Sequence, residues 1–70
     1  MARYGKMKNL MRRMLEPRGV RLYFYKNMGM LFVCAVMDRK YDEEYCTLEA
    51  DVSLFEETAD LIWQKLNSND

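Results

Sequence analysis

Few side chains in this 70-residue sequence are suited to covalent chemistry, since it has no histidine, no glycine-rich phosphate loop and only two serines. Cys34 and Cys46 would need an activating base or cation to act as nucleophiles. Two thiolates without histidine also leave a tetrahedral zinc site incomplete. The adjacent carboxylates Glu43 and Glu44 would point to opposite faces of a strand. The sequence therefore predicts no enzyme, no metal site and no cofactor.

The length and composition predict one domain spanning residues 1–70, with a packed core because 50% of the residues are hydrophobic. The longest apolar run, residues 28–37, is much shorter than the ~20 residues that cross a bilayer. No continuous apolar stretch marks a secretion signal, and two cysteines do not form a disulfide framework. We therefore expect a cytoplasmic protein that does not bind membranes.

Two segments have the apolar spacing of helices. The first runs from about Met7 to Leu15 and ends before Pro17, which disfavours helix at the preceding residue. The second runs from about Leu54 to Leu66, with Ser53 and Glu56 spaced as a capping box at its start. Each helix has one apolar face, so each requires a surface to pack against.

Three segments between the helices have strand character: Val20–Lys26, Met30–Met37 and Glu44–Glu49. The connection 27–29 suits a three-residue hairpin loop ending at Gly29, which places Phe24 opposite Phe32. A second turn centred on Lys40 places Cys34 opposite Cys46 and Phe32 opposite Leu48. The two registers agree, because both place the same apolar residues on one face of the sheet. This agreement supports both predicted turns.

These elements predict an α+β fold of order α-β-β-β-α: a two-layer sandwich in which both helices pack on one face of a three-stranded antiparallel meander. The predicted register assigns to the other face Arg21, Tyr23, Tyr25, Leu31, Val33, Ala35, Met37, Tyr45 and Thr47. Such an apolar, tyrosine-rich face is typical of an interface. Three alternatives remain open: one helix covers each face, two copies associate through it, or it binds a different partner.

Charge is divided unevenly along the chain. Residues 1–26 contain eight basic residues and one acidic residue, whereas residues 27–70 contain three basic and ten acidic residues. The cations of the first helix would suit nucleic-acid phosphates: they are Lys6, Lys8, Arg12 and Arg13. The acidic run 42–44 would suit a basic groove on a protein. The alternative for each group is an ordinary solvated surface that binds nothing.

The order of the elements resembles that of the double-stranded-RNA-binding domain along the whole chain. That family grips phosphates with a lysine-rich start to its second helix. The equivalent residues here, 52–57, are Val-Ser-Leu-Phe-Glu-Glu and are acidic. The resemblance therefore implies the topology, and we do not carry the RNA-binding activity over to this chain.

In its size and charge pattern the chain also resembles the small inhibitors that bacteriophages and mobile elements encode against host systems, such as anti-CRISPR proteins. This resemblance implies a non-enzymatic inhibitor or regulator that binds a protein or nucleoprotein complex. The residues predicted to bind that partner are Tyr23, Tyr25, Leu31, Val33, Asp42, Glu43, Glu44 and Tyr45. The alternatives are a nucleic-acid-binding regulator that uses the basic helix, and a homodimeric structural module joined through the sheet face.

Overall fold

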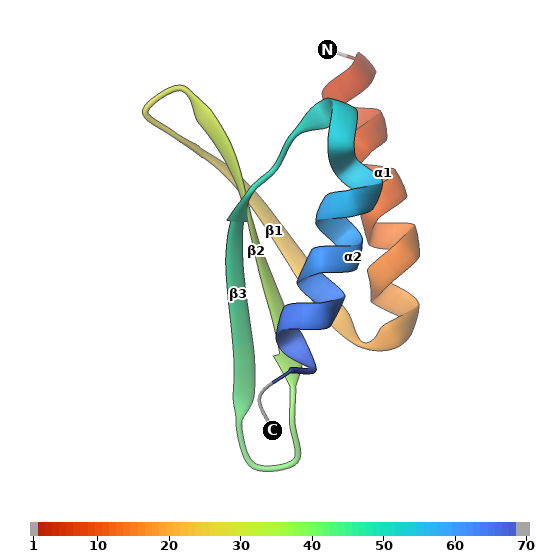
Figure 1. Ribbon diagram of the computed structural model, residues 1–70, viewed down its shortest axis with the longest axis vertical. Coiled ribbons are helices and arrows are strands. Elements are labelled where there is room, and N and C mark those ends of the chain that lie inside the picture. Colours follow the sequence, from red (N-terminus) through yellow and green to blue (C-terminus); the bar gives the residue numbers. More distant parts are fainter. Residues whose placement is uncertain (1, 69–70) are drawn as a thin grey trace.

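The computed structural model describes residues 2–68. The chain forms helix α1 (Ala2–Leu15), the short 3₁₀ helix η1 (Glu16–Arg18), strands β1 (Val20–Asn27), β2 (Met30–Asp38) and β3 (Glu43–Glu49), the short 3₁₀ helix η2 (Val52–Leu54) and helix α2 (Phe55–Leu66). The strands form an antiparallel sheet in the order β1-β2-β3. The α+β class, the element order and the meander are thus confirmed. In Figure 1 the two helices lie against each other on one side of the sheet.

Helix α1 ends where the sequence predicts and begins earlier, at Ala2 rather than near Met7. Pro17 lies in the 3₁₀ turn after the helix, where its missing backbone N–H costs nothing. Gly19 then adopts a left-handed conformation with φ of 83°, and its N–H donates to the Glu16 carbonyl over 2.9 Å. This turn directs the chain from the helix layer into β1.

Helix α2 starts differently from the prediction, because the capping box of Ser53 and Glu56 does not form. Instead, one carboxylate oxygen of Asp51 accepts the Ser53 backbone N–H over 2.9 Å and the Ser53 hydroxyl over 2.7 Å. The 3₁₀ turn η2 follows, and α2 begins only at Phe55. At the far end of α2, the Arg39 guanidinium donates to the Leu66 carbonyl and ties the helix to the β2–β3 turn.

The β1–β2 hairpin has a two-residue turn, Met28-Gly29, instead of the predicted three-residue loop. Both residues have positive φ, 53° and 78°, as the type I′ hairpin turn requires. Asn27 therefore pairs with Met30, and Phe24 lies opposite Val33 rather than Phe32. The predicted register of this hairpin is wrong by one residue.

The β2–β3 register is also shifted by one residue. Asp38 pairs with Glu43, and Ala35 rather than Cys34 lies opposite Cys46. The shift has the same sense in both hairpins, so β1 and β3 keep the faces predicted for them. Only β2 has its two faces exchanged relative to the prediction, because side chains alternate between faces along a strand.

The reversal of β2 moves two predicted partner-binding residues into the interior. Val33 has no exposed surface, and Leu31 is partly buried against the core. Ala35 and Met37, predicted for the outer face, likewise lie on the helix side, where Ala35 is fully buried and Met37 packs against the core. The residues of β2 that face away from the helices are Phe32, Cys34 and Val36, flanked by Met30 and Asp38 at the strand ends.

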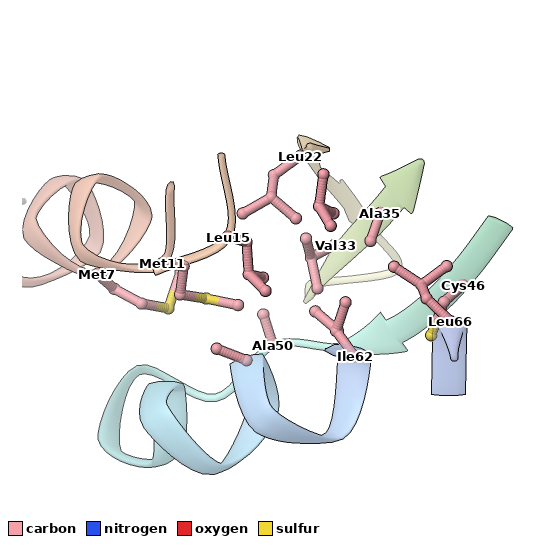
Figure 2. Packing of buried hydrophobic residues seen from close by; sticks show 12 residues of the cluster. Met7, Met11, Leu15, Leu22, Val33, Ala35, Cys46, Ala50, Ile62 and Leu66 are labelled. Carbon is pink, nitrogen blue, oxygen red and sulfur yellow. The ribbon is translucent and has the colours of Figure 1, made fainter. Parts of the chain in front are cut away.

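One hydrophobic core joins the helices to the sheet, and Figure 2 shows its side chains converging from both layers. Helix α1 contributes three fully buried residues and α2 another three, spaced as the sequence predicts. The buried cluster comprises Met7, Met11, Leu15, Val20, Leu22, Val33, Ala35, Cys46, Ala50, Ala59, Ile62 and Leu66. The opposite face of the sheet contributes none of these residues, and it contains the candidate site.

Candidate functional site

The sheet face that points away from the helices, called here the open face, is the candidate functional site. Strand alternation places on it Arg21, Tyr23, Tyr25, Met30, Phe32, Cys34, Val36, Asp38, Glu43, Tyr45, Thr47 and Glu49. The three tyrosines predicted for this face lie on it, because β1 and β3 keep their predicted faces. Tyr23, Tyr25 and Tyr45 expose 51%, 43% and 63% of their surface, respectively.

The end of the open face nearer the β1–β2 turn is aromatic and apolar. Tyr25 and Phe32 are directly opposite across β1 and β2. Their rings stack with centroids 5.6 Å apart and planes inclined by 19°. Met30, beside them, exposes 45% of its surface. A stacked pair of this kind is rigid and amphipathic, which suits the anchor of an interface.

The other end of the open face is a polar network centred on Arg21. Its guanidinium donates to the Tyr23 hydroxyl, to Asp38 and to Glu43, each over 3.0 Å. The Tyr45 hydroxyl donates to the second carboxylate oxygen of Glu43. This network links all three strands and includes the hydroxyl groups of two of the tyrosines.

The network changes the acid strength of two of its members. The negative charge of Asp38 raises the pKa of the Arg21 guanidinium above its ordinary value. The hydrogen bond to Glu43 raises the pKa of the Tyr45 hydroxyl, because ionisation would remove the proton that Glu43 accepts. Both side chains therefore keep their protons at neutral pH, and Tyr45 stays a hydrogen-bond donor.

Val36 is an apolar residue of the open face that is buried at the polar end, beside the Arg21 network. It lies on the open face between Arg21 and Tyr45, yet exposes only 5% of its surface. Val36 is also outside the core cluster formed with the helices. We attribute its burial to the long side chains of these two cross-strand neighbours. The apolar surface left for a partner is therefore concentrated at the Tyr25–Phe32 end.

The acidic residues predicted as a binding cluster do not form one patch. Asp42 is in the β2–β3 turn, where its carboxylate accepts the Glu43 backbone N–H over 2.7 Å. Glu43 lies on the open face and is paired with Arg21. Glu44, the next residue of β3, points to the helix side by strand alternation and is half-buried. Only Glu43 of the three thus belongs to the open face.

The two cysteines lie on opposite faces of the sheet. Cys34 is on the open face, half-buried between Tyr23 and Thr47, whereas Cys46 is in the core. Both thiols are free. Burial raises the pKa of the Cys46 thiol, so it is a poor nucleophile. Within residues 2–68 no group of three or more potential metal ligands occurs.

The predicted nucleic-acid-binding residues lie on α1, in the helix layer. Lys6 and Arg13 are exposed, and Lys8 and Arg12 are half-exposed. Lys8 lies over the Tyr4 ring, which Lys26 of β1 also approaches. Tyr4 and Lys26 are not among the residues predicted from the sequence, because their proximity depends on how α1 packs on β1.

No helix among the described residues is both long enough and apolar enough to span a membrane. Comparison with protein-family models, with curated proteins and with solved structures finds no match to this chain. The candidate function therefore rests on the chemistry of the surfaces described above.

Proposed function

We propose that this protein is a non-enzymatic binding module that docks its open face on a larger protein and acts as an inhibitor or regulator of it. The observation that carries the proposal is the open face itself. It presents three half-exposed tyrosines and a stacked Tyr25–Phe32 pair, and no element within residues 2–68 covers it. Tyrosine and arginine are the residue types most enriched at the centres of protein interfaces.

Charge on the open face favours a protein partner over nucleic acid and over a second copy. Three carboxylates, Asp38, Glu43 and Glu49, share the face with one guanidinium, that of Arg21. Phosphates would be repelled by this excess of negative charge. In a two-fold symmetric dimer the same patch meets itself, so two patches that each carry net negative charge would face each other. The partner that fits is an apolar protein surface bordered by basic residues.

The test compares tyrosines on and off the open face. The parent chain is used to isolate a partner from the cells that encode it, and dissociation constants are then measured calorimetrically with the purified partner. We expect Tyr23→Ala and Tyr25→Ala each to weaken binding about 10- to 30-fold, as removal of an interface anchor does. Tyr41→Ala is the matched control, because Tyr41 is 89% exposed in the β2–β3 turn and lies off the open face.

Thermal unfolding of each variant checks that the fold is intact, since the replaced rings are at least 43% exposed. Equal affinities for the parent, Tyr23→Ala and Tyr25→Ala would refute the proposal. A larger loss for Tyr41→Ala than for the two open-face variants would refute it as well.

A further inference from the structure

A second surface, separate from the open face, carries an unusual concentration of positive charge. It consists of four cations of α1 and one of β1, and is called here the basic strip: Lys6, Lys8, Arg12, Arg13 and Lys26. Helix α1 has no acidic residue in its first turn and none elsewhere along its length. The strip lies on the helix side of the sheet, because Lys26 approaches Tyr4 of α1.

Three of the five cations of the strip lie over aromatic rings. The Lys8 and Lys26 ammonium groups lie 4.4 Å and 5.6 Å from the centroid of the Tyr4 ring. The Arg12 guanidinium lies 5.2 Å from the centroid of Phe24. Two lysines from different elements thus converge on one ring, which is attractive for each cation separately but brings like charges together.

No carboxylate compensates this convergence within residues 4–68. The ion pairs found there both involve Arg21, which lies on the open face. Among the side chains of residues 4–68, no carboxylate oxygen lies within 4.0 Å of any of the five cations of the strip. An anion bound between the side chains would relieve their mutual repulsion, so the strip is complementary to a ligand with several closely spaced negative charges.

The shape of the strip selects among polyanions. At 100° per residue, Lys6, Asn9 and Arg13 share the outermost face of α1, and all three are exposed. The half-exposed Lys8 and Arg12 lie beside this face on the side toward β1, where they approach Tyr4 and Phe24. A helix fits the major groove of B-form DNA, where flanking cations reach the phosphates of both strands. The deep, narrow major groove of A-form RNA does not admit it.

The aromatic rings of the basic strip are poorly suited to binding single-stranded nucleic acid. Single-stranded nucleic acids bind by stacking bases on free aromatic faces. Tyr4 is occupied by Lys8 and Lys26, and Phe24 is packed against the core and covered by Arg12. From this charge, shape and ring occupancy we infer that the basic strip binds the phosphate backbone of duplex DNA, independently of base sequence.

The experiment measures the anisotropy of a fluorescein-labelled 20-base-pair DNA duplex titrated with the full chain from 25 to 200 mM NaCl. Five phosphate contacts predict a slope of about −4.5 for log affinity against log salt, or a loss of about 500-fold between 50 and 200 mM. Replacing two contacts, in Lys8→Gln/Lys26→Gln, should reduce that loss to about 40-fold. The same variant should bind at least 10-fold more weakly than the parent at 50 mM.

The matched control is Lys40→Gln/Lys65→Gln, which makes the same chemical change and the same change in net charge at exposed lysines outside the strip. It should bind within about 2-fold of the parent, because neither lysine contacts the phosphates in this arrangement. Equal losses for the two double variants would refute the inference, as would no binding by the parent at 25 mM NaCl. Tighter binding to duplex RNA or to a single strand of the same length would also refute it. Thermal unfolding verifies that both variants fold.

Discussion

Asp51 illustrates how one carboxylate replaces a motif predicted from sequence. The spacing of Ser53 and Glu56 predicts reciprocal capping, yet Ser53 gives both its N–H and its hydroxyl to Asp51. These bonds favour the ionised carboxylate and lower the pKa of Asp51 below its ordinary value of 3.8. A lowered pKa in the folded state means that the carboxylate stabilises the fold above pH 3.8. That contribution disappears as the pH falls through the lowered value.

Replacing Asp51 should therefore destabilise the protein in a pH-dependent way. We expect Asp51→Ala to have a lower urea midpoint than the parent at pH 7, and the difference to shrink progressively below pH 3.8. Asp51→Asn is the control, since its amide oxygen still accepts the Ser53 N–H. Its urea midpoint at pH 7 should fall by less than that of Asp51→Ala. A difference between Asp51→Ala and the parent that stays constant from pH 7 to pH 2 would contradict the assigned role of the carboxylate.

At the scale of the element, the β1–β2 turn decides which side of β2 faces the helices. Met28 adopts a φ of 53° and is 92% exposed. The left-handed region is costly for most residues with a Cβ but tolerated by asparagine, and Asn-Gly is the preferred pair in type I′ turns. Met28 therefore carries backbone strain without any compensating packing.

Met28→Asn should stabilise the protein by about 1 kcal/mol, which corresponds to a rise in Tm of roughly 4–8 °C for a chain of this size. Met28→Val should lower Tm, because a β-branched residue fits the left-handed region poorly. Thermal unfolding followed by circular dichroism measures both. If Met28→Asn did not raise Tm, the assigned two-residue turn would be contradicted. That result is expected for a three-residue loop in which only Gly29 is in the left-handed region.

The same element shows how far the sequence determines the fold and the site. Strands β1 and β3 alternate between apolar and polar residues, so their faces, and with them the three tyrosines, could be predicted. Strand β2 is apolar at both parities, so a slip of one residue leaves its pattern equally apolar. The sequence therefore predicts Val33 on the open face, but Val33 is buried on the helix side and Phe32 lies on the open face instead.

The parts of the two surfaces that depend on long-range packing could not be predicted. The Arg21 network requires β1 and β3 to flank β2 in the observed register, since Arg21 is 17 residues from Asp38 and 22 from Glu43. The convergence of Lys8 and Lys26 on Tyr4 requires α1 to pack beside β1. Sequence spacing shows which residues share an element, whereas these contacts join different elements.

At the scale of the whole molecule, a single core connects both helices to all three strands. A chain of this length is expected to have a total stability of only about 3–5 kcal/mol. Ile62 is fully buried within the core cluster, on the inward face of α2. Because the same core holds both layers together, losing packing at Ile62 weakens the contacts of helix and sheet at once.

Ile62→Ala should cost about 2–5 kcal/mol, a loss comparable to the whole stability of the chain. We expect the variant to be largely unfolded at 25 °C, with the helical and the tyrosine circular-dichroism signals lost together. The matched control is Leu61→Ala, in which the neighbouring residue of α2 is 42% exposed, and its free energy of unfolding should change by about 0.5 kcal/mol. If the sheet of Ile62→Ala kept its tyrosine signal while the helices melted, the two layers would not share one cooperative core.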